Sequence, residues 1–424
     1  MSDAPSKKKY RVVIIGAGIM GLSTAWHLAR RGITDVLVVD RGYLCGGASG
    51  RNGGGIRAQF SSETNIRLMR ESIEICREFA SQMKINVWFR QGGYLFLTRT
   101  KQRARMLEAS AKLQRDCGLD TRLLAPSEVR SIVPEIDPTG VELASFNPGD
   151  GVVFPWPFVW GYAKAAKDAG VEIVTFTEVE GFEMQGDKIT AVRLKKTRHD
   201  AIVAEDRDER TSAGGAPPKI AADRVRAIET DVERATIECE TVVCCAGAWS
   251  PAIARMVGIE LPNKPHRHEI CSTEPLKPWL GPLVADLTDG LYFSQSMRGE
   301  IVGGISVEPV PHGINQRSSA QFLATYARSL VRAVPTMTKV KVLRQWAGCY
   351  DLTPDGNPIV GRMDECPSMV MASGFMGHGF MMAPVMGRLL AEHVATSETT
   401  ELFERWNFRR FKEGKLLSES MIIG

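Results

Sequence analysis

The sequence predicts an α/β fold in which a Rossmann-like dinucleotide-binding domain is interleaved with a second, sheet-based (α+β) domain. Residues 12–40 pass from an apolar run through a glycine-rich turn into a helical pattern, then into a second apolar run closed by an acid. This order is typical of a nucleotide-binding βαβ unit. The 424 residues exceed what one hydrophobic core usually holds. Strand patterns return after unrelated segments, so we expect the two domains to alternate along the chain.

The glycine-rich turn after the first apolar run carries the first chemical prediction. Gly16 allows a tight turn out of the strand, Gly18 lets a pyrophosphate approach the backbone, and Gly21 lets the helix pack closely on the sheet. The helix begins near Ile19 and Met20, so its unpaired N–H groups and positive dipole end face the phosphates. Such glycine runs also occur in purely structural turns, but the flanking strands favour a bound dinucleotide.

Asp40 ends the second apolar run, where a carboxylate can accept the hydroxyls of an adenosine ribose. An acid at this place disfavours a 2′-phosphate, so NADP is not expected. An NAD-linked dehydrogenase stays open as an alternative on this unit alone.

Composition excludes several classes of protein. Hydrophobic residues make up 44% and charged residues 24% of the chain, as in ordinary globular proteins. The net charge of +4 is too small, and the basic residues too scattered, to predict a nucleic-acid partner. No apolar run approaches the roughly 18 residues of a membrane helix, and no signal segment is visible, so we expect a cytoplasmic protein. The nine cysteines show no paired metal-ligand spacing, so no metal is expected.

Apolar periodicity and turn residues predict the remaining elements. Met297, Arg298 and Gly299 lie between two apolar runs, which predicts a hairpin within residues 289–307. Residues 196–233 mix charges of both signs with glycine and proline, and we expect a partly disordered surface insertion there. The expected helices are 63–82, 101–117, 158–169, 319–331 and one within 374–394, and the expected strands are 92–98, 171–176, 187–195 and 235–245.

Four segments occur in the order that a known family shows: GAGIMGLSTA, ASGRNGGGIR, VVCCAGAWS, and TPDGNPIVGR followed by GFMGHGFMMAP. On these segments the chain resembles the D-amino acid oxidase superfamily of flavoproteins. Within it, the chain is similar to the branch of sarcosine oxidase β-subunits and proline or opine dehydrogenase β-subunits. The resemblance implies non-covalent FAD in a discontinuous domain of residues 1–85, 146–262 and 343–424. It implies a substrate domain of residues 86–145 and 263–342.

The resemblance also implies which residues contact the flavin. Arg51 and Asn52 could neutralise the pyrophosphate or donate to the flavin edge; a flexible surface turn is the alternative for their loop. The N–H groups of the helix after Gly377 could stabilise negative charge at the flavin N1–C2=O edge. Beyond the glycine-rich turn and Asp40, the expected contacts are Arg41, Ser49, Gly50, Arg51, Asn52, Gly53, Gly54, Val179, Ala246, Gly247, Trp249, Gly348, Gly377, His378, Gly379, Phe380 and Met381.

For the substrate, the resemblance implies an arginine that pairs with a carboxylate. Arg57 aligns with this arginine, and Arg298 on the expected hairpin is a second candidate; a solvated surface arginine is the alternative for both. Glu269 and Tyr292 are expected to line the pocket. His378 belongs to the expected site, but we do not expect it to act as a general base, because hydride transfer in this family needs no obvious side-chain base.

Departures from the family pattern narrow the expectation. Met381 stands where sarcosine oxidases carry a lysine that helps to hold the carboxylate, which argues against sarcosine itself. The lysine that activates oxygen in monomeric relatives aligns near Ile301, which carries no charge. A dehydrogenase is therefore at least as well supported as an oxidase. Pro155 replaces the histidine that carries FMN, so an FMN shared with a partner would not be covalent. The flavin-linking cysteine of monomeric relatives falls at Gly348, and a link at Cys349 would need a one-residue shift.

We therefore expect an enzyme that oxidises the C–N bond of a secondary or primary amine or amino acid, sarcosine-, proline- or opine-like, by hydride transfer to flavin N5. Water would hydrolyse the resulting imine, and the electrons would pass to oxygen or to a redox partner. The alternative is a flavin-binding β-subunit that is inactive without the other subunits of a hetero-oligomer. An NAD-linked dehydrogenase is disfavoured, because the GRNGGG and GFMGHGF segments would then have no role.

Overall fold

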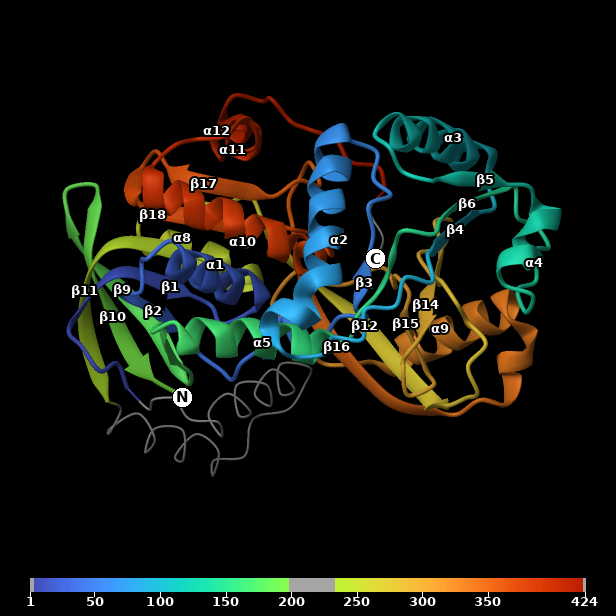
Figure 1. Ribbon diagram of the computed structural model, residues 1–424, viewed down its shortest axis with the longest axis horizontal. Coiled ribbons are helices and arrows are strands. Elements are labelled where there is room, and N and C mark those ends of the chain that lie inside the picture. The colour runs from blue at the N-terminus through green and yellow to red at the C-terminus, as the bar shows by residue number, and fades with distance from the viewer. Residues whose placement is uncertain (1–3, 198–232, 422–424) are drawn as a thin grey trace.

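The computed structural model describes residues 4–197 and 233–421 and, over these ranges, is built on two large β-sheets along the long axis of the molecule (Figure 1). The predicted α/β class with a Rossmann-like unit is confirmed. Most of the expected insertion, residues 198–232, lies outside the described residues. At its described ends, the Lys196 N–H donates to the Glu233 carbonyl at 2.9 Å, so the segment joins two adjacent strands.

The first sheet has the strand order β17-β18-β11-β1-β2-β8, and β10 also pairs with β11 and with β9. The central strands are parallel, whereas β17 and the β9–β10 hairpin add antiparallel pairs. Every residue of β2 is buried, as parallel strands covered on both faces require. The strands are β1 (Lys9–Ile15), β2 (Val36–Val39), β8 (Glu172–Val174), β9 (Thr177–Gln185), β10 (Lys188–Lys196), β11 (Arg234–Cys244), β17 (Ile359–Met363) and β18 (Cys366–Ser373).

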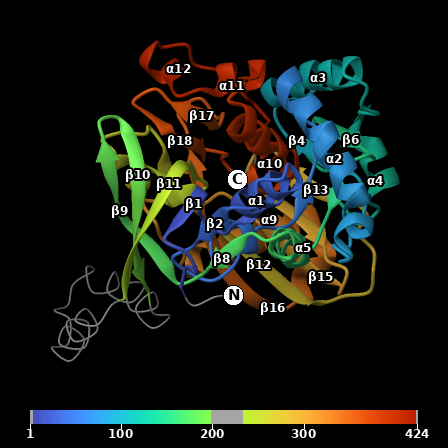
Figure 2. The ribbon, with the colours of Figure 1, turned by 60° about the vertical axis from the view of Figure 1, so that its left-hand side comes forward.

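Helices cover one face of this sheet because their apolar sides meet its buried valines and isoleucines in one core. These helices are α1 (Ile19–Arg30), α5 (Pro155–Asp168) and α10 (Gly379–Thr396), with α2 (Glu63–Met83) beside α10. The β9–β10 hairpin and α8 (Ser250–Arg255) contribute to a second core on the other face. Figure 2 shows this hairpin beside β11. The carboxyl ends of the parallel strands are left for the loops that form the site.

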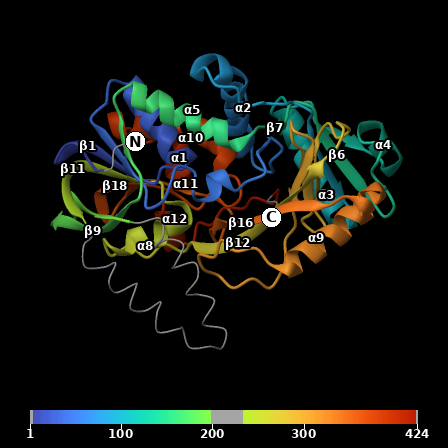
Figure 3. The ribbon, with the colours of Figure 1, turned by 90° about the horizontal axis from the view of Figure 1, so that it is seen from below.

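The second sheet has the order β16-β12-β15-β14-β13-β4-β6-β5 and is antiparallel except for the β13–β4 pair. One face packs on α9 (Ala320–Ala333), where Phe322 and Tyr326 meet Phe293. Figure 3 shows α9 in the half of the molecule away from α1 and α5. The strands are β4 (Tyr94–Thr98), β5 (Arg122–Leu124), β6 (Leu143–Asn147), β12 (Lys264–Pro275), β13 (Leu283–Asp286), β14 (Tyr292–Gln295), β15 (Glu300–Gly304) and β16 (Val342–Leu352).

Shorter elements complete the chain. Strands β3 and β7 pair with each other near the junction of the two sheets. The short elements and remaining helices are β3 (Gly55–Ile56), β7 (Gly151–Val152), α3 (Lys101–Asp116), α4 (Val129–Ile132), α11 (Glu401–Trp406) and α12 (Arg409–Lys412). Over the described ranges, every helix is too short or too polar to cross a bilayer.

β16 corrects the domain boundary expected between residues 342 and 343. This strand pairs with β12 over its whole length, from Val342 opposite Thr273 to Leu352 opposite Lys264. It therefore belongs to the second sheet, and the chain returns to the first domain only after Leu352. Composition could not place this boundary, because β16 runs without a break through the expected boundary at residues 342 and 343.

The other expected elements agree with the structure in kind. The five expected helices are α2, α3, α5, α9 and α10, and the expected hairpin is formed by β14 and β15. α5 begins at Pro155 rather than Phe158, because proline suits the first turn of a helix. Two long strands, β9 and β12, were not anticipated, since charged residues interrupt their apolar pattern.

Candidate active site

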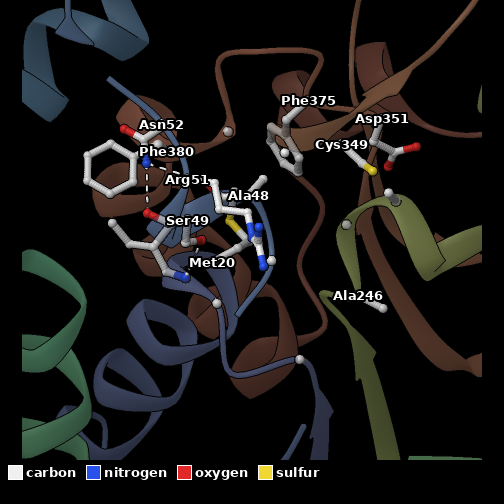
Figure 4. A pocket seen from close by; sticks show the side chains of 18 of the residues that line it. Met20, Ala48, Ser49, Arg51, Asn52, Ala246, Cys349, Asp351, Phe375 and Phe380 are labelled. Atoms are coloured by element: carbon white, nitrogen blue, oxygen red, sulfur yellow. Dashed lines mark hydrogen bonds between the residues drawn. The ribbon is translucent and has the colours of Figure 1, made fainter. Parts of the chain in front are cut away.

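A cavity of about 710 Å³ lies between the two sheets. Its walls come from the β1–α1 turn, the loop before β3, the ends of β2 and β11, the start of α10, and strands β12, β14 and β16. In the close view of Figure 4, Ser49 and Arg51 lie on one side of the cavity and Cys349 and Asp351 on the other. Ligands of open α/β sheets bind at the carboxyl ends of the strands, which is where this cavity opens.

The β1–α1 turn has the geometry that its glycines predict. Gly16 has φ +109°, and a Cβ there would lie 2.4 Å from the carbonyl oxygen of Cys245. A Cβ on Gly21 would lie 2.1 Å from the Gly16 carbonyl, so Gly21 serves helix packing and does not line the cavity. The Ile19 N–H donates to Ser49 Oγ at 3.0 Å, so this donor of the helix start is already bonded within the protein.

Asp40 ties two loops of the cavity together. Its carboxylate accepts hydrogen bonds from the Ala17 N–H at 2.7 Å and from the Gly42 N–H at 2.8 Å. Burial raises the pKa of Asp40, while these two N–H groups oppose the shift. The residue therefore fixes the turn after β1 against the turn after β2, and it also lines the cavity beside Arg41.

The loop before β3 is held by internal hydrogen bonds, which argues against a flexible surface turn. Arg51 donates from Nε to the Gly46 carbonyl at 3.0 Å and from Nη1 to the Ala347 carbonyl at 3.1 Å. Asn52 donates to the Ser49 carbonyl at 2.7 Å. The loop is thus bonded to β16 of the second sheet. Gly50 does not line the cavity, because a Cβ there would lie 2.5 Å from the carbonyl oxygen of Cys45.

The start of α10 forms the far wall. Asp351 accepts hydrogen bonds from Ser373 Oγ and the Gly374 N–H, both at 2.6 Å, and so holds the turn that leads into the helix. Gly377 packs against the ring of Tyr350, since a Cβ on residue 377 would lie 2.8 Å from Tyr350 Cζ. The first turn of α10, from Gly379, lines the cavity, and the N–H groups of a first helical turn have no partners within the helix.

Aromatic side chains and two histidines surround the end of the cavity at the second sheet. His268 contacts the hydroxyl of Tyr292 at 3.1 Å through Nε2, and its ring stacks on Tyr350 with centroids 4.6 Å apart. Burial lowers the pKa of His268 to about 3, with a smaller effect from His266. Burial also raises the pKa of Tyr94, Tyr292 and Tyr350 above the usual range. These groups are therefore neutral at physiological pH.

Arg57 is the cation of this end, and it is fully buried. Its Nη1 donates to the Gln59 carbonyl, and its Nη2 donates to the Met421 carbonyl and lies 2.9 Å from His378 Nε2. Since arginine only donates, His378 Nε2 is the acceptor. Burial and the Arg57 charge lower the pKa of His378 well below its usual value. Among the described residues, Arg57 Nε has no acceptor, although the residue lines the cavity.

Two expected pocket residues lie elsewhere, and both expectations are wrong. The side chain of Arg298 is 81% exposed, pairs with Glu300 at 2.9 Å and does not line the cavity. Glu269 accepts hydrogen bonds from Ser319, the residue before α9, and from Gln345. It therefore holds α9 to the second sheet and does not line the cavity.

The other expected residues are brought together. Apart from Gly21 and Gly50, every residue expected to contact the flavin lines the cavity, as do Arg57 and Tyr292. Cys349 also lines it, with its sulfur 3.4 Å from the Asn315 carbonyl.

Sequence reasoning missed Tyr94, His268, Gln316, Tyr350 and Asp351, all of which line the cavity. Strand alternation could have found Tyr350, because it follows Gly348 by two residues on the same strand. The positions of His268 and Gln316 depend on how β12 pairs and on the loop before α9, and neither leaves a local signal.

Comparisons with known proteins agree with this geometry. The sequence pattern of the DAO family, described as FAD dependent oxidoreductase, matches residues 11–206 and 209–393. The chain is 27% identical to sarcosine oxidase subunit beta of Rhodobacter capsulatus, over 99% of this chain and 92% of the relative. It is 31% identical to FAD-dependent oxidoreductase domain-containing protein 1 of Mus musculus, over 97% and 87%. Among solved structures, L-proline dehydrogenase from P. horikoshii matches with a TM-score of 0.83 at 31% identity, covering 96% of this chain and 99% of that one.

Proposed function

The chain belongs to the DAO family of FAD-dependent oxidoreductases, and we propose that it oxidises the C–N bond of an amino acid, with proline and N-alkyl amino acids as the first substrates to test. The observation that carries the proposal is one continuous cavity that joins the Rossmann turn to a pocket containing a buried arginine and neutral aromatic hydroxyls. The 31% identity to L-proline dehydrogenase supports the choice of a secondary amino acid.

The residues of the cavity fit FAD. The volume lies within the roughly 300–1,000 Å³ of small-molecule sites, and the cavity extends from Asp40 to the start of α10. The backbone at Gly18 is open to the cavity, where a larger residue would meet Ser49 Oγ at 3.1 Å. When bound, FAD supplies the acceptor for the hydride that leaves the carbon beside the substrate nitrogen. The N–H groups at the start of α10 would stabilise negative charge that develops beside them.

Arg57 supports an anionic group on the substrate. A buried guanidinium without a bonded carboxylate is unfavourable unless acceptors surround it, and its Nε has no acceptor among the described residues. A substrate carboxylate at this wall would supply that acceptor. We therefore keep Arg57 as the carboxylate-binding residue, and we do not assign His378 as a base, since its Nε2 already accepts from Arg57.

The hydroxyls of Tyr94, Tyr292 and Tyr350 would orient the amino acid without adding charge. Hydride loss requires a neutral amine, and burial beside the Arg57 cation lowers an amine pKa in the required direction. The neutral, enclosed pocket would also exclude water until the imine forms. In this scheme the protein orients the substrate and stabilises its charges, and no side chain removes a proton from carbon.

A dehydrogenase is the form of the activity that we propose. Among the residues that line the cavity in the described ranges, none is a lysine. Ile301 is fully buried in the core of the second sheet and cannot place a charge near the ligand. These features support electron transfer to an acceptor other than oxygen.

A second candidate is a subunit that works only in a larger assembly. The 27% identity to sarcosine oxidase subunit beta supports it, as do exposed aromatic side chains around the start of α5: Tyr43, Trp88, Phe154 and Trp160. Trp156 joins this surface to the cavity wall, since it stacks on Tyr43, which lines the cavity. Exposed aromatic patches often mark protein interfaces.

The test is the flavin spectrum of the purified chain under anaerobic conditions, recorded while proline, sarcosine and other N-alkyl amino acids are added. We expect flavin bands that bleach with a secondary amino acid and recover slowly in air but quickly with an artificial acceptor. A flavin that no amino acid bleaches in the single chain, but that bleaches after partner subunits are added, would favour the second candidate. A protein that binds no FAD would refute both.

A further inference from the structure

The chain after α12 forms a strap across the junction of the two sheets. Residues 413–421 run without regular secondary structure from α12 to the middle of the molecule (Figure 1). The strap is fixed near its start, where the Leu417 N–H donates to Asp355 Oδ2 at 3.2 Å, and Asp355 is itself bonded to Arg410 of α12. At the other end, Met421 is fully buried among side chains of β4 and β13.

Glu419 clamps the strap to the residues before and within α2. Its carboxylate accepts from the Ser61 N–H at 2.9 Å and from Asn65 Nδ2 at 2.8 Å, and the Ser420 N–H donates to Ser61 Oγ at 2.8 Å. The side chain is nearly buried. A buried carboxylate needs such hydrogen bonds to remain charged, so the clamp is a specific attachment of the strap.

The clamp delivers a backbone oxygen to Arg57. The Met421 carbonyl accepts from Arg57 Nη2, the same nitrogen that contacts His378 Nε2. Among the described residues, no carboxylate is hydrogen-bonded to Arg57. Burial lowers the pKa of Arg57, and the interactions with Tyr94, Glu419 and Asp150 oppose that shift. The strap thus provides one of the hydrogen-bond acceptors of this buried cation and one of the carboxylates whose charge acts on it.

We propose that residues 413–421 are a positioning strap, in which Glu419 and the Met421 carbonyl hold the guanidinium of Arg57 against His378 and so set its Nε for the carboxylate of the substrate. The assignment of the anion rests on the proposed function; the coupling between the strap and Arg57 does not. Neither strap residue needs to touch the substrate, so both are positioning residues.

Ligand affinity gives the first test, with the FAD-loaded full chain and two probes that cannot lose a hydride. Pyrrole-2-carboxylate is a planar analogue of proline, and pyrrole-2-carboxamide is its uncharged counterpart; perturbation of the flavin spectrum reports their binding. We expect Glu419→Ala to weaken the carboxylate about tenfold, the loss of one hydrogen bond to a charged group, and to leave the carboxamide unchanged. In an Arg57→Lys background the same substitution should have little further effect. Equal weakening of both probes, or an undiminished effect with Arg57→Lys, would overturn the proposal.

Reciprocal release of the strap gives the second test and needs no ligand. If Arg57 and the strap are coupled, Arg57→Lys must loosen the strap as Glu419→Ala does, so trypsin should cut faster after Lys415, whose side chain is 76% exposed. Glu401→Ala, which removes an exposed acid of α11 outside the strap, is the matched control and should bind pyrrole-2-carboxylate like the wild type. Unchanged cleavage in Arg57→Lys would refute the coupling. If wild type binds neither probe, the proposed substrate class fails, and the cleavage rates still decide the coupling.

Discussion

Removal of the Asp40 carboxylate should release the cofactor, and the structure gives the size of the effect. The carboxylate accepts two backbone N–H groups, at 2.7 and 2.8 Å, from the turns that follow β1 and β2. Hydrogen bonds to charged groups contribute about 1.5–3 kcal/mol each, and Gly42 borders the cavity, where water can satisfy its freed N–H. We therefore take the low end, about 3 kcal/mol for both. If this whole free energy is lost from FAD binding, Asp40→Ala weakens the affinity for FAD roughly a hundredfold, since about 1.4 kcal/mol corresponds to a tenfold change in affinity.

Titration of the apoprotein with FAD, followed by the quenching of flavin fluorescence, measures this change. Asp40→Asn should give an intermediate affinity, because the amide oxygen can accept one of the two N–H groups. Asp35→Ala is the matched control: this acid precedes β2, pairs with Lys7 at 2.8 Å, and is not part of the cavity wall. If Asp40→Ala bound FAD as tightly as Asp35→Ala, the assignment of this end of the cavity to the dinucleotide would be wrong.

Three further predictions use other parts of the structure. Arg410→Met should destabilise the fold by about 3–5 kcal/mol in thermal unfolding, because it leaves Asp355 as an uncompensated buried carboxylate; Arg410→Met with Asp355→Asn should cost less, and equal losses would contradict the ion pair. Burial raises the pKa of Asp355, but the hydrogen bond and charge of Arg410 outweigh it, so the pKa is lowered overall. The wild-type ion pair is therefore fully stabilising above about pH 4, and its stabilisation is lost as the pH falls through the lower folded pKa. His268→Gln should leave the shape of the kcat/KM profile unchanged between about pH 5 and 9, since His268 with a pKa of about 3 is neutral throughout; loss of an acid limb near pH 6 would refute this. Acid precipitation should release FAD from wild type and from Cys349→Ala alike, and flavin retained only by the wild-type pellet would instead establish a covalent link.

The sequence predicted the parts of the site whose roles depend on local backbone geometry. Gly16 must adopt φ +109° beside the Cys245 carbonyl, a conformation that favours glycine, so the residue type itself reports the turn. Asp40 follows a short buried strand and the Gly377 turn precedes a helix, and each position relative to its own element is readable from the chain. These predictions concern neighbours in sequence, where pattern and structure are directly linked.

The substrate end could not be predicted in the same way, because it depends on contacts between distant segments. Arg298 and Arg57 are both arginines next to strand patterns, yet the β14–β15 turn exposes one while Met421, far along the chain, encloses the other. Glu269 precedes a buried strand residue, but pairing of β12 with β16 turns it toward Ser319. No local pattern records which face of the second sheet meets the first domain.

The distribution of hydrogen-bonding groups around the cavity points to where specificity resides. Asp40, Arg51 and Asp351 are committed to backbone groups of the protein, so they shape the cavity rather than select its ligand. At the second sheet the hydroxyls are neutral, and they can bind either a donor or an acceptor. Arg57 Nε is different, since it is a charged donor, buried and without an acceptor among the described residues. Discrimination is strongest where the wrong ligand leaves such a group unpaired. An amine without a carboxylate should therefore be the poorest substrate, and the strap that positions Arg57 should control that preference more than any residue beside the amine.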